Sequence, residues 1–123
     1  MLRILLVDDQ PLVRRGWRMR LALESDMEVV GEAGNGQEAL ALAGALLPDV
    51  VLMDVEMPVM DGLTAARALY DARLGVVVMV SIRDDQETRT RAQAAGVHTF
   101  LGKQQSVEQL LWAVREAARE AAR

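Results

Sequence analysis

The 123-residue sequence contains no cysteine, few aromatic residues and no long apolar run. Without cysteine the chain has no disulfide framework, no thiol nucleophile and no thiolate metal site. Aromatic residues make up only 3% of the sequence although 51% of it is hydrophobic, so we expect a core of Leu, Val, Ala and Met side chains. The apolar stretches are far shorter than the roughly 20 residues that a membrane-spanning helix needs. We therefore expect no membrane association and, by default, a cytoplasmic location.

Basic residues are not concentrated in any one segment. The chain has 14 Lys and Arg residues against 18 Asp and Glu residues, which gives a net charge of −4 at pH 7. Binding to nucleic acid needs a basic stripe, commonly with interleaved aromatic side chains, and the sequence has none. We therefore do not expect this chain alone to bind DNA. Its length is typical of one compact domain, so we expect residues 1–123 to form a single domain.

Short apolar runs alternate with helical patterns along the whole chain. The runs are rich in β-branched residues and apolar at nearly every position, as strands are when helices cover both faces of a parallel sheet. Regular alternation of this kind predicts a doubly wound α/β domain. The predicted strands are 2–7, 29–33, 50–53, 76–80 and 99–101. The predicted helix starts are Pro11, Asn35 with Glu38, Asp84 with Glu87, and Ser106 with Gln109.

Three carboxylates stand directly after two of these predicted strands. Asp8 and Asp9 end the first apolar run, and Asp54 ends the run at 50–53. Ligands of open α/β sheets bind outside the carboxyl ends of the strands, so these acids can converge on one crevice. A divalent cation that prefers oxygen ligands would offset the repulsion among them, and Mg²⁺ is the cation that we expect. Taken together, the acids predict a site that binds a metal and accepts a phosphoryl group. Asp8 and Asp9 without Asp54 would be better explained as a solvated turn or a helix cap ahead of Pro11.

The stretch PDVVLMDVEMPVMDG at 48–62, with Asp8 and Asp9 before it and Lys103 after it, resembles the receiver domain of bacterial two-component response regulators. The segments ILLVDDQPLVRRG at 4–16 and GEAGNGQEAL at 31–40 are most similar to the NarL/FixJ-type subgroup. The resemblance covers nearly the whole chain. It implies a flavodoxin-like fold with a five-stranded parallel sheet in the order 2-1-3-4-5 and helices on both faces.

The resemblance also implies roles for single acidic residues. Asp54 matches the phosphoacceptor, whose carboxylate attacks the phosphorus of a phosphohistidine or a small acyl phosphate, and Asp is a plausible covalent nucleophile. Asp8 and Asp9 match the acidic pair that binds the metal. Asp54 and the backbone carbonyl of Glu56 would complete the protein ligands of Mg²⁺, or of another divalent cation such as Mn²⁺.

Three further residues match functional positions of the family. Lys103 is the only lysine, all other basic residues being Arg, and a compact ammonium suits contact with one oxygen better than a guanidinium does. The resemblance implies that Lys103 pairs with the phosphoacceptor and then with the phosphoryl group. It implies that Ser81 hydrogen-bonds a phosphoryl oxygen. It also implies that Phe100 is an aromatic switch that turns inward on phosphorylation, with core filling by this only Phe as the rival interpretation.

The function implied by the resemblance is signalling rather than metabolic catalysis. We expect a sensor histidine kinase to phosphorylate Asp54 and the phosphate to change a partner or dimerisation surface. The subgroup implies control of transcription through a C-terminal helix-turn-helix domain that this chain does not contain. DNA would then be bound only through that domain, and a homodimer could form on phosphorylation. We expect no enzymatic activity beyond the chain's own phosphorylation and dephosphorylation.

Several features depart from the family pattern or allow another interpretation. Ile82 stands where a smaller residue is frequent, which would narrow access of phosphodonors. Gln104 replaces a frequent Pro, so we expect a trans peptide after Lys103. The segment at 83–96 lacks large apolar side chains and should be weakly anchored. Trp112 is either an exposed anchor or a partly buried ring. A phosphorylation-independent interaction module remains the alternative function, and a metal-dependent aspartyl phosphatase is disfavoured because Asp8 and Asp9 are adjacent.

Overall fold

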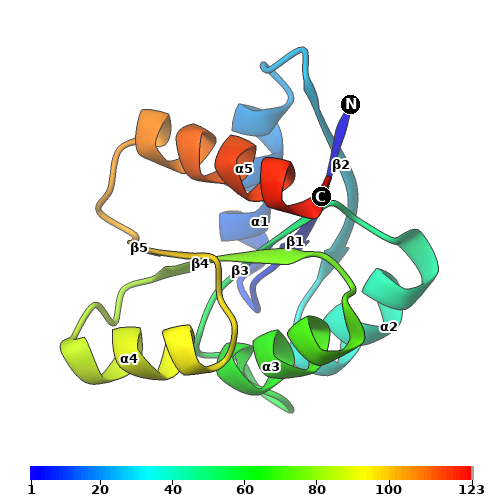
Figure 1. The fold of residues 1–123 in the computed structure, drawn as a ribbon. Helices are drawn as coiled ribbons and strands as arrows, with labels where there is room; N and C mark the ends of the chain where they lie inside the picture. The colour runs from blue at the N-terminus through cyan, green and yellow to red at the C-terminus, as the bar shows by residue number, and fades with distance from the viewer. Residues whose placement is uncertain (123) are drawn as a thin grey trace.

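The computed structural model describes residues 1–122 and contains one five-stranded parallel sheet between two layers of helices (Figure 1). The strands lie in the order β2-β1-β3-β4-β5, and each neighbouring pair is parallel. The predicted doubly wound sheet in the order 2-1-3-4-5 is therefore confirmed. The strands are β1 (Leu2–Val7), β2 (Met27–Ala33), β3 (Val50–Met53), β4 (Val76–Ser81) and β5 (Thr99–Gly102). The helices are α1 (Pro11–Leu21), α2 (Gly36–Leu46), α3 (Gly62–Ala72), α4 (Gln86–Ala94) and α5 (Val107–Ala121).

Helices cover both faces of the sheet, α1 and α5 on one face and α2, α3 and α4 on the other (Figure 1). Side chains of β1 alternate between these faces because successive residues of a strand point in opposite directions. Leu5 and Val7 belong to the hydrophobic cluster beneath α2, α3 and α4, whereas Ile4 and Leu6 belong to the cluster beneath α1 and α5. All four side chains are fully buried. This burial on two faces explains why positions 4–7 of the strand carry no polar side chain.

Small side chains allow the helices to approach the sheet closely. Ala39 and Ala43 of α2 and Ala65 and Ala66 of α3 are all fully buried in the same cluster. The expected core of aliphatic residues, without large rings, is confirmed.

Trp112 of α5 is 62% exposed, so of the two alternatives for this residue the exposed ring is the one observed. Within residues 1–122 no helix combines the length and the apolar character needed to cross a membrane.

Two of the predicted helix caps are confirmed. The side chain of Asn35 accepts a hydrogen bond from the backbone N–H of Glu38 at 2.9 Å. Ser106 and Gln109 form the predicted capping box at the start of α5, each side chain accepting the backbone N–H of the other. Such caps satisfy N–H groups that have no partner inside the helix.

The predicted start of α4 is wrong by one residue. Asp85, not Asp84, caps the helix, accepting the backbone N–H and the hydroxyl of Thr88 at 3.2 and 2.7 Å. The side chain of Asp84 instead pairs with Arg89 and accepts a hydrogen bond from Gln104. Adjacent Asp residues suit an N-cap equally well, so the sequence pattern does not distinguish them.

Helix α4 buries only small side chains. Within the helix Thr88 and Ala92 are buried, and Ala95 follows directly after it. The stabilisation from burial scales with apolar area at about 25 cal/mol per Å², so these side chains contribute little. The expectation of a weakly anchored segment at 83–96 is supported by this burial pattern.

Candidate functional site

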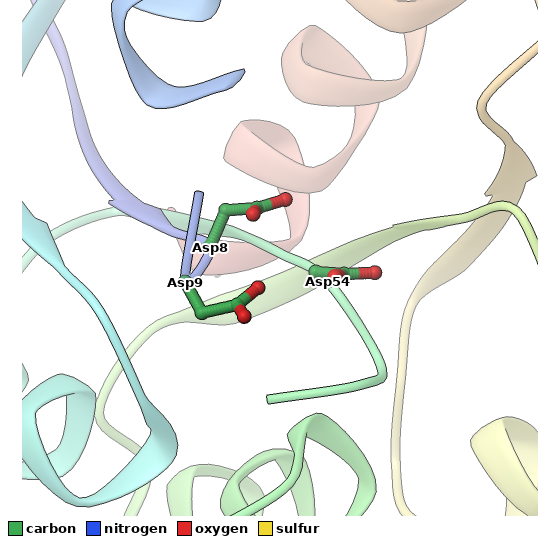
Figure 2. A group of neighbouring side chains, drawn as sticks. All are labelled: Asp8, Asp9 and Asp54. Carbon is green, nitrogen blue, oxygen red and sulfur yellow. The ribbon is translucent and has the colours of Figure 1, made fainter. Parts of the chain in front are cut away.

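The three predicted acids come together at the carboxyl ends of β1 and β3. These strands are neighbours, with Val7 paired to Met53, so the residues that follow them leave the sheet side by side. One carboxylate oxygen from each of Asp8, Asp9 and Asp54 lies within 4.8 Å of the other two, and Figure 2 shows the three side chains converging. Asp8 and Asp54 are buried, whereas Asp9 is exposed.

Lys103 brings a positive charge to this cluster from the end of β5. Its Nζ lies 3.2 Å from Oδ2 of Asp8 and 3.8 Å from Oδ2 of Asp54. The lysine is fixed by its backbone N–H, which donates to the carbonyl oxygen of Ser81 at 2.9 Å. The ammonium therefore contacts both buried carboxylates of the cluster, the predicted phosphoacceptor among them.

The electrostatics of Asp54 follow from its burial. Burial raises the pKa of its carboxyl from 3.8 to about 6, Lys103 counteracts this, and the negative charges of Asp8 and Asp9 raise the pKa further. The backbone N–H of Val55, which donates to Oδ1 of Asp54 at 2.8 Å, acts in the lowering direction. A single lysine thus compensates three carboxylates only in part.

The donor set fits a hard divalent cation. All three groups offer carboxylate oxygens, the ligands that Mg²⁺ prefers, and two of them are held in buried positions. A divalent cation bound among them would supply the positive charge that Lys103 alone does not. The same oxygens also suit Mn²⁺.

A cavity of about 530 Å³ opens beside the acids and is lined by most of the other predicted residues of the site. Asp54, Lys103, Ser81 and Ile82 all line it, together with Glu56. Ser81 is fully buried, and its Oγ accepts the backbone N–H of Arg83 at 3.0 Å. The exposed Ile82 side chain lines the same cavity. Its position is consistent with the expectation that it narrows the access of phosphodonors.

Phe100 lies outside this cavity. Its ring is half-buried against the cluster beneath α2, α3 and α4. The guanidinium of Arg89 in α4 lies 4.9 Å from the centre of the ring, within the range of a cation–π contact. The predicted switch residue is thus in contact with the helix that buries only small side chains.

The loop after Asp54 returns so close to the backbone of Asp54 that one loop position, residue 62, needs glycine. The N–H of Gly62 donates to the carbonyl oxygen of Val55 at 2.7 Å, and a Cβ at residue 62 would lie 2.0 Å from the carbonyl oxygen of Asp54. Val59 in the same loop has φ +68°, a region that β-branched residues rarely adopt. The loop is therefore tightly constrained against the predicted phosphoacceptor.

Arg14 of α1 contacts the acidic cluster and was not expected from the sequence. Its Nη1 donates to the backbone carbonyl of Asp8, and its Nε donates to Glu32 at 3.0 Å. The basic residues of the chain are nearly all Arg, and nothing in the sequence distinguishes this one from its neighbours in α1.

Comparison with known proteins agrees with this geometry. The family model for the response regulator receiver domain matches residues 4–115. The chain belongs to this receiver-domain family. Receiver domains are signalling modules of two-component systems, and they bind Mg²⁺ at an acidic pocket.

Similar curated proteins place this receiver domain in the NarL/LuxR group. It is 41% identical over 119 residues to the uncharacterized transcriptional regulatory protein YxjL of Bacillus subtilis, covering 96% of this chain and 55% of YxjL. It is 38% identical over 116 residues to the nitrate/nitrite response regulator NarL of Escherichia coli K12, covering 94% of this chain and 54% of NarL. The chain thus spans about half the length of these relatives.

Solved structures show the same fold along nearly the whole chain. The receiver domain of the putative response regulator NarL from Mycobacterium tuberculosis matches with a TM-score of 0.91 and 36% identity, covering 96% of both chains. The response regulator domain of Thermotoga maritima CheB matches with a TM-score of 0.89 and 31% identity, covering 97% of both chains. The expected flavodoxin-like receiver fold and the expected subgroup are confirmed.

Proposed function

We propose that this receiver domain is a phosphorylation-dependent switch whose phosphoacceptor is Asp54. The observation that carries the proposal is the convergence of Asp8, Asp9 and the only lysine, Lys103, on this carboxylate from two other strands. A strand-end Asp that merely caps a turn needs none of these neighbours. The cavity beside Asp54 gives a phosphodonor access to it.

In the proposed reaction an oxygen of the Asp54 carboxylate attacks the phosphorus of the donor. The new O–P bond gives an acyl phosphate on the protein, and the bond from phosphorus to the leaving group breaks. Asp8, Asp9, Asp54 and the backbone carbonyl of Glu56 would hold Mg²⁺, which supplies positive charge to the phosphoryl oxygens. Because the carboxylate is the reactive form, a bound cation also favours the reaction by opposing protonation of Asp54.

Lys103 and Ser81 act on the phosphorylated state. Lys103 already contacts Asp8 and Asp54, so its ammonium is placed to pair with a phosphoryl oxygen as the charge on Asp54 grows. The Ser81 hydroxyl, which lines the same cavity, would donate a hydrogen bond to another phosphoryl oxygen. Phe100 would turn inward as Ser81 moves, and the segment at 83–95 would move with it.

The output of the switch is a changed partner surface. A sensor histidine kinase is the proposed donor, and a homodimer of phosphorylated chains is one proposed product. Regulation of transcription would pass through a DNA-binding effector domain, consistent with the greater length of YxjL and NarL. We place these events in the cytoplasm and assign no reaction other than the chain's own phosphorylation and dephosphorylation.

The test is intact-mass measurement after exposure to acetyl phosphate or to phosphoramidate, whose P–N bond resembles that of phosphohistidine. Wild type should gain one phosphoryl group with Mg²⁺ and none with EDTA, and Asp54→Asn should gain none. Asp71→Asn is a matched control because it removes an exposed carboxylate of α3, which pairs with Arg67 of the same helix. It should be phosphorylated as wild type is.

The alternative function is a phosphorylation-independent interaction module, which the exposed Ile82 at the cavity favours. Absence of an adduct with either donor, at any Mg²⁺ concentration, would support that alternative. An adduct that persists in Asp54→Asn would instead show that the phosphoacceptor has been assigned to the wrong residue.

A further inference from the structure

Arg14 connects the acidic cluster to the helix and the strand beside it. The residue lies in α1, and its side chain is only 18% exposed. Its Nε donates to Oε1 of Glu32 in β2 at 3.0 Å, and its Nη1 donates to the backbone carbonyl of Asp8. One guanidinium thus joins α1, β2 and the end of β1. The planar fork of a guanidinium suits such a double contact.

Several atoms of Asp8 form hydrogen bonds, and the bond from Arg14 goes to the backbone carbonyl oxygen. The N–H of Asp8 donates to the carbonyl oxygen of Ala33 at 3.1 Å, and Oδ1 accepts the N–H of Gln10 at 2.9 Å. The carbonyl bound by Arg14 belongs to the peptide group that joins Asp8 to Asp9. Because a peptide group is planar, fixing this oxygen also fixes the direction in which the chain enters Asp9.

We propose that Arg14 is a positioning residue that sets the affinity of the acidic cluster for a divalent cation. The inference rests on the proposed function, since it assigns Asp8 and Asp9 to the metal. Mg²⁺ demands nearly ideal octahedral geometry, so the placement of the two carboxylates relative to each other matters. Loss of a hydrogen bond that orients metal ligands commonly lowers metal affinity about 10- to 100-fold.

The charge of Arg14 by itself acts in the opposite direction, because a cation close to the cluster repels Mg²⁺. Glu32 offsets this charge. Burial acts to raise the pKa of Glu32, but hydrogen bonds from Arg18 and Arg14 outweigh it and hold the pKa below its usual value. Glu32 therefore stays ionised at neutral pH, and the orienting contact with Asp8 can prevail over the repulsion.

Arg18 provides a matched control for this charge. It lies one turn after Arg14 in α1, and its Nε donates to the other carboxylate oxygen of Glu32 at 2.7 Å. No contact between Arg18 and Asp8 is found among the described residues. Replacing either arginine removes one positive charge and one hydrogen bond to Glu32, but only the replacement of Arg14 frees the Asp8 carbonyl.

The experiment is calorimetric titration of the full chain with Mg²⁺ for wild type, Arg14→Met and Arg18→Met. Met keeps a long, helix-compatible side chain but has no donor. We expect the Kd of Arg14→Met to be at least about tenfold higher than that of wild type. Arg18→Met should stay within about twofold of wild type, or bind slightly more tightly because a repelling charge is lost. Melting temperatures in EDTA measure the structural effect of each substitution separately.

Equal Mg²⁺ affinities of Arg14→Met and Arg18→Met would overturn the inference, as would a lower melting temperature of Arg14→Met with unchanged affinity. A wild type that binds no Mg²⁺ would overturn the metal site of the proposed function together with the inference. If Arg14→Met does not fold, Arg14→Lys decides the matter. Its ammonium keeps the charge but lacks the fork for both acceptors, so its affinity should fall severalfold, and an unchanged affinity would contradict the proposal.

Discussion

At the scale of single residues, the carboxyl of Asp54 differs most from its behaviour in water. Burial raises its pKa from 3.8 to about 6, and Lys103 offsets only part of this effect. At a pH between 3.8 and about 6, the Asp54 carboxyl keeps its proton in the folded, metal-free protein but releases it in the unfolded chain. Ionisation of Asp54 therefore opposes folding, and its contribution to stability falls as the pH rises from about 4 through about 6.

We expect Asp54→Asn to be more stable than wild type at pH 7.5 in EDTA, because the amide needs no charge in the buried position. A shift of about two pKa units corresponds to a difference on the order of 2–3 kcal/mol in the free energy of unfolding. The difference should disappear near pH 4. Urea unfolding at a series of pH values measures it, with Asp71→Asn as the control for an exposed carboxylate. A difference that does not depend on pH would contradict the assigned pKa.

Ile82 is the residue whose size we expect to limit the rate of phosphorylation. Its side chain is 76% exposed and lines the cavity beside Asp54 and Lys103. Ile82→Ala should raise the rate with acetyl phosphate about three- to tenfold, equivalent to about 0.6–1.4 kcal/mol of activation free energy. The time course of intact mass measures the rate. Leu23→Ala, which shortens an equally exposed side chain outside this cavity, serves as control, and equal rates in all three proteins would refute the idea.

At the scale of elements, the sequence predicted the features that depend on a repeating pattern or on residues close together in the chain. The central strands β1, β3 and β4 were predictable because burial on both faces leaves their buried positions almost without polar residues. The caps at Asn35 and Ser106 were predictable because they depend on neighbouring residues. The choice of Asp85 as the cap of α4 could not be predicted from neighbouring residues. The side chain of Asp84 pairs with Arg89 and accepts a hydrogen bond from Gln104, which is 20 positions further along the chain.

The same limit applies to the site. Asp8, Asp9 and Asp54 could be placed together because their position at strand ends determines where they lie. The contacts made by Arg14 and Arg89 could not be predicted. They depend on which face of a helix meets Glu32 or Phe100 and on how a long side chain is oriented there. The sequence carries no periodic signal for that choice.

Helix α4 is the element in which we expect the switch to be most easily disturbed. Arg89 stacks on Phe100 and pairs with Asp84, and it thereby holds the ring in its present orientation. A cation–π contact contributes about 0.5–2 kcal/mol, enough to change the ratio of two conformations several-fold. Arg89→Gln should therefore move the unphosphorylated protein toward the phosphorylated arrangement.

Fluorine NMR can measure this shift, because Phe100 is the only Phe and fluorophenylalanine therefore gives one resonance. For each variant the phosphorylated spectrum supplies its own end point. The resonance of unphosphorylated Arg89→Gln should lie closer to its end point than that of wild type. Arg91→Gln changes an exposed arginine of the same helix and should behave as wild type does. If the unphosphorylated resonance lies equally far from its phosphorylated end point in all three proteins, Arg89 has no such role.

At the scale of the whole molecule, the acidic cluster joins parts of the chain that are distant in sequence. Its groups follow β1 and β3, and Lys103 adds β5. A cation that binds only the folded chain stabilises all of it together, by about 2.7 kcal/mol when its free concentration is one hundred times Kd. We expect Mg²⁺ to raise the melting temperature of wild type in a single cooperative transition.

Calorimetric melting with increasing Mg²⁺ measures this stabilisation, and NaCl at matched ionic strength controls for screening of repulsion. Asp9→Asn should lose most of the effect of Mg²⁺ while keeping a similar melting temperature in EDTA, because Asp9 is exposed. An equal gain from NaCl would show that screening, not binding, is responsible.

The position of Lys103 also matters for handling this protein in the laboratory. Reagents that modify amines meet only two such groups in the chain, the amino terminus and Nζ of Lys103, which is 23% exposed. Coupling to a surface or a dye through lysine therefore consumes the ammonium beside Asp54. The same scarcity makes that ammonium addressable, because chemical labelling of one lysine reports directly on whether a ligand covers the site.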